Sequence, residues 1–287
     1  MSILVTGATG TIGSLVAQGL AAQGATVKAL VRQAGKAQFP AGVTEAVADL
    51  TDVAALRTAL QGVRTLFLLN AVAADEVTQA LQALNLAREA GIQRIVYLSV
   101  IHADTFTDVP HFTGKHAVER MIESLDLPAT VLRPAYFMQN DRTVQQVIAG
   151  YGVYPMPIGS AGVAMVDTRD LADVAVAELL RRDRAAEPLP RTTFDVVGPE
   201  ALTGESAAAT WSGVLGRAIA YGGNDLPAFE AQLASAMPGW MAYDMRLMMA
   251  RIQQQGMQPA PGSVQHLEGL LGRPLRRYEA LVRELVA

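Results

Sequence analysis

SILVTGATGTIG, residues 2–13, combines a short apolar run with three regularly spaced glycines. The run Ile3, Leu4, Val5 is rich in β-branched residues, as is typical of a buried strand. Gly7, Gly10 and Gly13 follow at GxxGxxG spacing, after which apolar residues recur with helical period. A strand, a glycine turn and a helix in this order predict the first βα unit of a parallel α/β sheet.

The glycine turn also predicts a binding site for a diphosphate. Gly7 allows a tight turn, Gly10 lets the backbone approach a pyrophosphate, and Gly13 lets the helix pack against the strand. The helix N-terminus then offers unpaired N–H groups and the positive end of its dipole. A glycine-rich turn that binds nothing is the alternative. The position next to a strand and a helix favours dinucleotide binding over it.

Composition excludes several classes of site. The 287 residues are 51% hydrophobic, enough for one or two packed domains. There is no cysteine, which excludes disulfides, thiolate metal sites and a cysteine nucleophile, and the four histidines lack metal-binding spacing. We therefore expect no metal.

Charge and hydropathy point to small-molecule partners. The net charge is −4 without a long basic run, so no nucleic acid partner is expected. The chain runs straight into its first strand, and no apolar stretch reaches the ~18–20 residues of a membrane span. We expect a cytoplasmic protein that does not bind membranes, with a homodimer as one option for its assembly.

Strand-like and helix-like segments alternate through the first two thirds of the chain. This alternation predicts a Rossmann-type, doubly wound parallel sheet with helices on both faces. The predicted strands are 3–6, 26–31, 45–48, 65–69, 94–99 and 130–133, and the predicted helices are 12–23, 53–61, 75–90 and 113–125. In such sheets the ligand lies at the C-terminal ends of the strands, where Asn70 and Ser99 stand.

The regular alternation ends after Pro134. We expect a loop region with a short strand over 150–166, a helix over 170–182, a strand over 193–197 and a helix over 204–215 capped by Thr203. The remainder is expected to be helical, broken at its prolines. The predicted organisation is a dinucleotide-binding domain of residues 1–150 plus about 165–200. A smaller substrate-side lobe, mainly helical, takes about 150–165 and 200–287 and is expected to cover the ligand crevice.

The end of the second strand indicates which dinucleotide is preferred. An acidic residue there hydrogen-bonds the 2′-hydroxyl of NAD, whereas an arginine favours the 2′-phosphate of NADP. Here Arg32 occupies the position and Lys36 follows, with no acid between them. We expect NADP(H) to be preferred and NAD(H) to be the second option. A solvated loop charge is the alternative for Arg32.

Asp49 and Leu50 end the third strand and have two interpretations. The Asp49 carboxylate could accept a hydrogen bond from the adenine amino group, or it could cap the helix that begins near Asp52. Both interpretations stay open at the level of sequence.

The segment 111–125 predicts a helix with polar residues on its inward face. His111, Lys115, Val118, Ile122 and Leu125 share one face, of which the last three are expected to be core. An inward lysine needs a partner, and a nicotinamide ribose or a substrate could supply it. The alternative is a boundary lysine whose ammonium reaches water.

Several of these features together resemble the NmrA-like group of atypical short-chain dehydrogenases/reductases. They are the GATGTIG start, Arg32, Tyr97-Leu98-Ser99, the Lys115…Glu119 helix, LRPAYFMQN at 132–140, VGPEALT at 197–203 and LGRPLR at 271–276. The group includes NADPH-dependent quinone and triphenylmethane-dye reductases, as well as regulators that bind the cofactor without turnover. The resemblance covers nearly the whole chain.

The resemblance implies roles for individual residues. Thr9, Thr11 and Ile12 would lie on the pyrophosphate loop, and Asn70 and Ala71 on the ribose side. Ser99 would face the nicotinamide, Lys115 would bind its ribose, and Pro134, Tyr136 and Phe137 would lie near the nicotinamide or the substrate.

One departure from the wider dehydrogenase pattern concerns the proton donor. Where most short-chain enzymes have Tyr-x-x-x-Lys, this chain has His111 before Lys115. His111 could donate a proton to a reduced quinone oxygen, could only hydrogen-bond the substrate while water supplies protons, or could have no role.

We predict an NAD(P)H-dependent reductase of an apolar aromatic or quinone-like acceptor. The alternative is a non-catalytic NADP(H) sensor that regulates a protein partner.

Overall fold

A computed structural model describes residues 2–287, which form two compact units. The first unit comprises the described residues up to Val100, together with Gly114–Arg133 and Arg169–Phe194. The second comprises Ile101–Thr113, Pro134–Thr168 and Asp195–Ala287. Four elements, α4, β6, α6 and β8, run across a boundary between these segments.

The central sheet of the first unit has the predicted doubly wound topology. Its seven strands are β1 (Ser2–Val5), β2 (Val27–Val31), β3 (Val43–Val47), β4 (Val63–Leu68), β5 (Ile95–Leu98), β6 (Ala129–Pro134) and β8 (Thr192–Val196), in the order β3-β2-β1-β4-β5-β6-β8. The pairs from β3 through β6 are parallel. The order reverses at β1, and this switch point is where such folds bind ligands.

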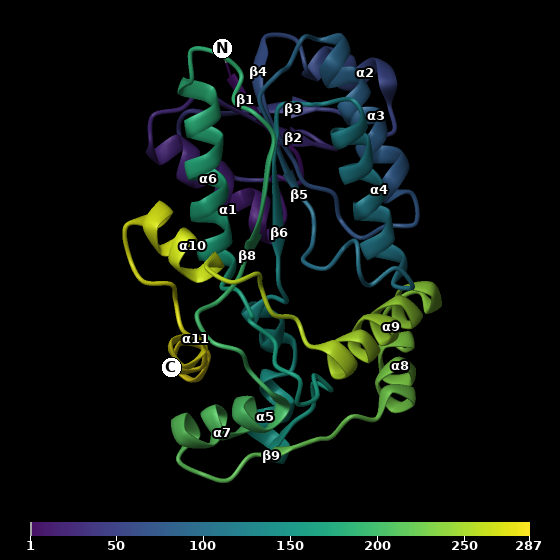
Figure 1. Ribbon diagram of the computed structural model, residues 1–287, viewed down its shortest axis with the longest axis vertical. Coiled ribbons are helices and arrows are strands. Elements are labelled where there is room, and N and C mark those ends of the chain that lie inside the picture. Colours follow the sequence, from purple (N-terminus) through teal and green to yellow (C-terminus); the bar gives the residue numbers. More distant parts are fainter. Residues whose placement is uncertain (1) are drawn as a thin grey trace. The chain divides into compact units, whose positions relative to one another are not determined.

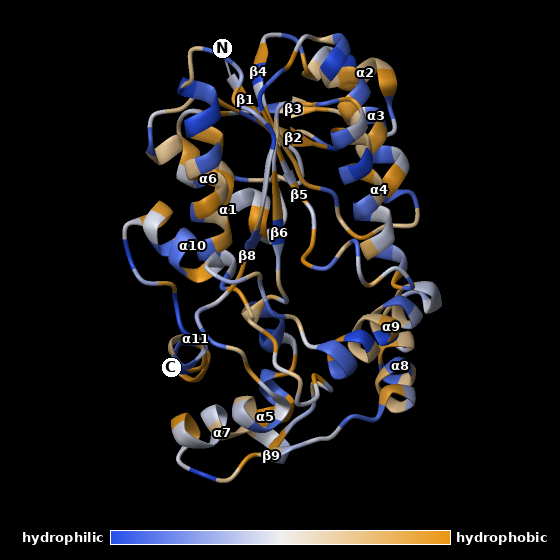
Figure 2. Ribbon diagram, in the orientation of Figure 1, coloured by the Kyte–Doolittle hydropathy of each residue, from blue (hydrophilic) through white to orange (hydrophobic). Residues whose placement is uncertain are grey.

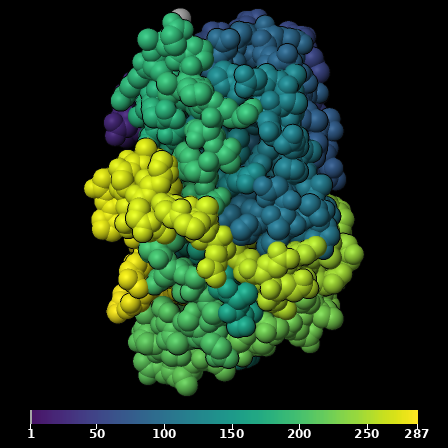
Figure 3. Space-filling view, in the orientation of Figure 1, coloured from purple at the N-terminus to yellow at the C-terminus, as the bar shows by residue number. Residues whose placement is uncertain are grey.

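Five helices cover the two faces of this sheet (Figure 1). They are α1 (Thr11–Ala22), α2 (Val53–Ala59), α3 (Glu76–Glu89), α4 (Pro110–Ser124) and α6 (Thr168–Arg184). One face carries α1 and α6, which approach so closely that a Cβ on Gly19 would lie 2.8 Å from Val176 Cγ2. The outer side of α6 forms part of the molecular surface (Figure 3), where the Arg181 side chain is 44% exposed.

The other face carries α2, α3 and α4 and holds one continuous apolar core. Leu56, Leu84, Val118 and Ile122 pack there against strand residues such as Leu66, and all five are at most 1% exposed. Figure 2 shows hydrophobic residues along the strands and mixed hydropathy on the helices, as expected for amphipathic helices on a buried sheet.

The second unit contains short elements that the sequence pattern did not indicate. A 3₁₀-helix η1 (Met138–Thr143) and α5 (Gln145–Tyr151) precede β7 (Val153–Tyr154), which pairs in parallel with β9 (Ala220–Tyr221). The sequence predicted a short strand in this region but neither η1, α5 nor β9. These elements are short, and they lie outside the regular strand–helix alternation that revealed equally short elements in the first unit.

The remaining helices match the predicted helical C-terminal region. They are α7 (Gly204–Leu215), α8 (Leu226–Ala234), α9 (Gly239–Gln255), α10 (Ser263–Leu271) and α11 (Tyr278–Val286). Thr203 caps α7 through a reciprocal pair of hydrogen bonds with Ser206, as predicted. Figure 1 shows α8 and α9 lying side by side as a helical pair.

Candidate functional site

The glycine turn between β1 and α1 has the predicted geometry. Gly7 has φ +61°, a conformation that favours glycine, and its carbonyl accepts a hydrogen bond from Gly10 N at 2.9 Å. A Cβ on Gly13 would lie 2.1 Å from the Gly7 carbonyl oxygen. Thr6 Oγ1 fixes the turn against the end of β4, donating to Leu69 O at 2.8 Å and accepting from Leu69 N at 2.7 Å.

The N-terminus of α1 is left open for an anion. Its N-cap is Gly10, no side chain caps the helix, and its first turn holds no acidic residue. Thr9, Gly10 and Thr11 are exposed, while Ile12 and Gly13 are buried under the turn. The first amides of the helix therefore lack a side-chain partner and can bind phosphate oxygens.

Two buried polar atoms lie at the ends of neighbouring strands in the same unit. Asn70 follows β4 and is 5% exposed, and Ser99 follows β5 and is 2% exposed. Asn70 Nδ2 donates to Gln79 Oε1 at 3.4 Å, but Asn70 Oδ1 and Ser99 Oγ find no hydrogen-bond partner among residues 2–287. An unsatisfied buried polar atom costs ~1–3 kcal/mol unless water or a ligand supplies the partner, so both atoms can accept a ligand hydrogen bond. Ala71, next to Asn70, is exposed.

The loop after β2 carries the two predicted cationic side chains. Arg32 and Lys36 are both exposed. Glu45 Oε2 of β3 accepts a hydrogen bond from Gly35 N at 2.9 Å and so holds this loop. The sequence showed no acid between Arg32 and Lys36, but the tertiary fold brings Glu45 to the loop from the next strand.

Asp49 does not cap the following helix, so that interpretation was wrong. Its Oδ1 accepts hydrogen bonds from Thr51 N at 2.8 Å and Thr51 Oγ1 at 2.6 Å, whereas Asp52 caps α2 through Ala55 N. The Thr51 hydrogen bonds, with a smaller contribution from the Arg32 charge, lower the pKa of Asp49. Leu50 is half-buried, and its carbonyl accepts from Gln82 Nε2 at 2.9 Å.

Lys115 on α4 faces inward and has an acidic partner that the sequence did not reveal. It is 7% exposed, and its Nζ lies 2.7 Å from Oε1 of Glu76, which is itself 4% exposed. Tyr97 on β5 lies buried near this pair. Its burial first, and then the charges of Glu76 and Glu119, raise its pKa. The ion pair fixes the position of the Lys115 ammonium at the start of α3.

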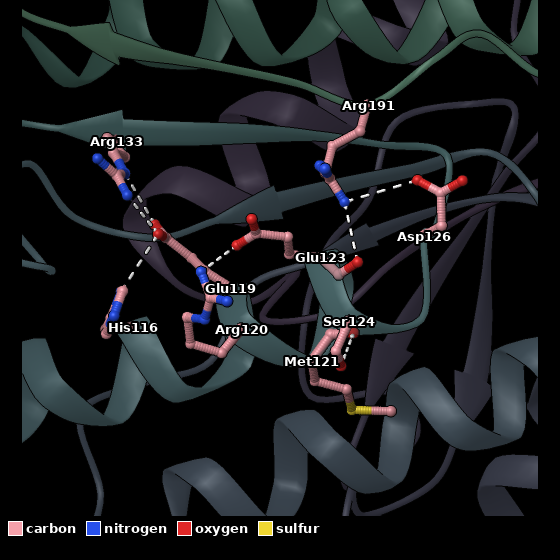
Figure 4. Close-up of polar contacts among 9 residues, drawn as sticks. All are labelled: His116, Glu119, Arg120, Met121, Glu123, Ser124, Asp126, Arg133 and Arg191. Atoms are coloured by element: carbon pink, nitrogen blue, oxygen red, sulfur yellow. Dashed lines mark hydrogen bonds and ion pairs between the residues drawn. The ribbon is translucent and has the colours of Figure 1, made fainter.

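One turn further along α4, Glu119 binds Arg133 at the end of β6 (Figure 4). Glu119 accepts from Arg133 Nε at 3.0 Å and from Nη2 at 2.5 Å, and His116 Nδ1 lies 3.8 Å away. Such a bidentate pair between helix and strand ends holds α4 in register with the sheet. Leu125 is 41% exposed and lies beyond the helix end, so its predicted place in the core was wrong.

In the second unit, His111 has a buried carboxylate partner. Its Nδ1 lies 2.6 Å from Oδ2 of Asp244 on α9, and its backbone N donates to Asp244 Oδ1 at 3.4 Å. The His111 and Asp244 side chains are 9% and 1% exposed. The Phe112 ring meets the imidazole edge to face, with ring centroids 4.7 Å apart.

The segment after β6 also belongs to the second unit. Pro134 is buried, whereas Tyr136 and Phe137 are half-buried. Tyr136 N donates to Met257 Sδ at 3.1 Å, and Phe137 forms a β-bridge with Val166. Burial is the main cause that raises the Tyr136 pKa, so its hydroxyl stays protonated. Whether these three side chains contact a cofactor stays a prediction.

Three residues of this arrangement were missed at the level of sequence: Glu45, Glu76 and Asp244. Glu76 begins a predicted helix, where an acid is ordinary, and Asp244 lies inside the Met-rich stretch 240–249. For Glu76 and Asp244, only the predicted inward position of their partners, Lys115 and His111, hinted that buried acids were needed. Glu45 left no such signal, since its partner is the backbone N of the exposed Gly35.

Within the described residues, the structure shows neither a metal-binding cluster nor a membrane-spanning helix. Within residues 2–287, no group of three or more His, Cys, Asp or Glu side chains is arranged to hold a metal ion. No helix among these residues is long and apolar enough to cross a membrane.

The model of one protein family matches residues 1–264, and its description is NmrA-like. The chain belongs to the NmrA-like family. It is 31% identical over 281 residues to an NAD(P)H azoreductase of Xenophilus azovorans, covering 96% of this chain and 95% of that protein. It is 30% identical over 239 residues to quinone oxidoreductase 2 of Escherichia coli, covering 81% of each.

Solved structures confirm the fold over the full length of this family member. An NADPH-dependent quinone oxidoreductase from Escherichia coli, complexed with NADPH, superposes with a TM-score of 0.87 at 26% identity, covering 99% of this chain and 100% of that one. The triphenylmethane reductase of Citrobacter sp. matches with a TM-score of 0.86 at 24% identity, covering 100% of this chain and 99% of that one.

Proposed function

We propose that this chain is an NAD(P)H-dependent reductase that transfers hydride to an aromatic or quinone-like acceptor, with NADPH preferred. The observation that carries the proposal is the set of unsatisfied groups in the first unit: the open N-terminus of α1, Asn70 Oδ1 and Ser99 Oγ. Azoreductase and quinone oxidoreductase relatives support the reductase class.

The residues present fit a pyridine dinucleotide. The Gly7–Gly13 turn, with Thr9, Thr11 and Ile12, would hold the pyrophosphate, and Arg32 and Lys36 would attract a 2′-phosphate. Asp49 and Leu50 would lie at the adenine. Asn70 and Ala71 would line the ribose, and Ser99 the nicotinamide.

Two residues of α4 are proposed for roles of their own. Lys115, fixed by Glu76, would bind the nicotinamide ribose, and His111 would supply a proton to the acceptor. When bound, the cofactor supplies the hydride, and the chain supplies position and protection from water. Pro134, Tyr136 and Phe137 are proposed to lie near the nicotinamide or the acceptor.

The test combines binding and turnover. Calorimetry should show NADP⁺ binding in the micromolar range, and purified protein with NADPH should reduce members of a panel of quinones, azo dyes and triphenylmethane dyes, followed at the NADPH absorbance band. Ser99→Ala should weaken dinucleotide binding, because it removes the unsatisfied hydroxyl without adding volume.

Two outcomes would speak against a reductase. Absence of binding at millimolar dinucleotide would overturn the proposal altogether. Binding without turnover of any acceptor would favour the cofactor-sensing regulator.

The cytoplasmic location and a homodimeric assembly are further proposals. Fractionation tests the location, and light scattering tests the assembly.

A further inference from the structure

We propose that Asp244 is a positioning residue that orients His111 so that its Nε2 delivers the proton to the acceptor. The inference rests on the proposed reductase function and deepens it. The cofactor would supply the hydride of the reduction, and His111 of this chain would supply the proton.

The burial of Asp244 calls for an explanation. On α9 it shares a buried face with Met248 and Ile252, which are 7% and 0% exposed, and it is 1% exposed itself. Burying a carboxylate among apolar side chains is costly unless it is paired and hydrogen-bonded. Asp244 contacts two groups of His111: the ring nitrogen Nδ1 and the backbone N.

These contacts fix both the position and the tautomer of the ring. A carboxylate only accepts hydrogen bonds, so Nδ1 carries the hydrogen in the 2.6 Å contact. Nε2 is then the nitrogen that takes up a second proton from solvent, and the resulting imidazolium can deliver this Nε2 proton to a ligand. Phe112, packed edge to face at 4.7 Å, restricts rotation of the imidazole. The contact with the backbone N of His111, in the first turn of α4, places the negative charge at the positive end of the helix.

The proton matters for some acceptors and not for others. A quinone takes up one hydride and one proton to give the hydroquinone, and an azo bond takes up the same pair to give the hydrazo compound. A triphenylmethane dye is a carbocation, so hydride alone forms the new C–H bond and gives the neutral leuco dye. An acceptor that needs no proton is thus an internal control for proton delivery.

The experiment compares turnover of a quinone and of a cationic triphenylmethane dye by the full chain with NADPH. In D244N, we expect quinone turnover at saturation to fall about 10- to 100-fold, and in H111Q about 100-fold or more, because general acid catalysis contributes ~10²–10⁴-fold. Dye turnover and NADPH affinity should stay within about threefold in both variants.

The matched control is R251Q. Arg251 Nε on α9 binds Asp108 Oδ1, just before α4, at 2.6 Å, so this variant also removes a polar contact of α9 but leaves His111 untouched. It should keep the wild-type ratio of quinone to dye turnover. If D244N lowers both turnovers alike, or neither, the proposal is overturned and Asp244 is only structural.

A spectroscopic measurement keeps the inference testable without the dye or if D244N does not fold. Nitrogen-15 NMR of histidine-labelled protein should show His111 with hydrogen on Nδ1 and a strongly downfield Nδ1–H proton, absent in H111Q. Hydrogen on Nε2 alone would overturn the positioning role. Absence of turnover with every acceptor, together with the expected spectrum, would refute the reductase function but leave the orientation by Asp244 standing.

Discussion

Asp141 in η1 makes the stability of the second unit depend on pH. It is 0% exposed, accepts a hydrogen bond from Tyr278 Oη, and lies 3.4 Å from Tyr154 Oη. Trp211 Nε1 donates to Tyr278 Oη at 2.8 Å, which extends the network to α7. Burial raises the pKa of Asp141 to about 6, although the hydrogen bonds from Tyr278 and Tyr154 act in the opposite direction.

The size and sign of the effect follow from linkage. The pKa of Asp141 rises from 3.8 to about 6 on folding, and at ~1.36 kcal/mol per unit this amounts to ~3 kcal/mol. Because the folded pKa is the higher one, the folded state binds the proton more tightly than the unfolded state. The stabilisation is fully present below about pH 4 and is lost as pH rises towards about 6 and above.

Asp141→Asn removes this titration while it keeps the size of the side chain. Urea unfolding should be measured between pH 4 and 7.5 by tryptophan fluorescence, since both tryptophans, Trp211 and Trp240, lie in the second unit. The difference in unfolding free energy, variant minus wild type, should rise by ~3 kcal/mol over this range. Asp126→Asn, at a side chain that is 95% exposed, is the control and should give a flat difference. A difference for Asp141→Asn that is also flat within ~0.5 kcal/mol would refute the reasoning.

Three further perturbations test the first unit. Gly13→Ala places a Cβ 2.1 Å from the Gly7 carbonyl oxygen. We expect the free energy of unfolding to fall by ~1–3 kcal/mol and calorimetry to show weaker NADP⁺ binding. Unchanged affinity would contradict the proposed role of the turn. Glu76→Gln leaves the buried Lys115 ammonium unpaired and should cost ~3–5 kcal/mol of stability. The double variant with Lys115→Met should recover part of this loss. A loss below ~1 kcal/mol in the single variant would show that water reaches the pair. Arg32→Ala should raise the Kd for NADPH about 10-fold and that for NADH less than twofold, and equal changes would remove Arg32 from phosphate recognition.

The sequence alone was sufficient for the first βα unit, the alternation of strands and helices, and the cap of α7. These features depend on residues that are neighbours along the chain, such as the glycines at 7, 10 and 13 or the Thr203–Ser206 pair. Their physical cause is local: backbone freedom, apolar period and capping. The inward side of α4 followed from the same period, although Leu125, past the helix end, did not.

Only the tertiary structure decided which charges meet. Lys115 pairs with Glu76 of another helix, His111 with Asp244 more than a hundred residues later, and the loop after β2 with Glu45 of the next strand. Nothing in the local pattern marks these three acids, because an acid at a helix start or on a strand is usually solvated. The role of Glu76 and Asp244 arises from burial, which forces each charge to find a partner, and burial is fixed only when distant elements pack together. Glu45 is half-buried, and its role depends on the strand pairing that brings it to the backbone N of Gly35.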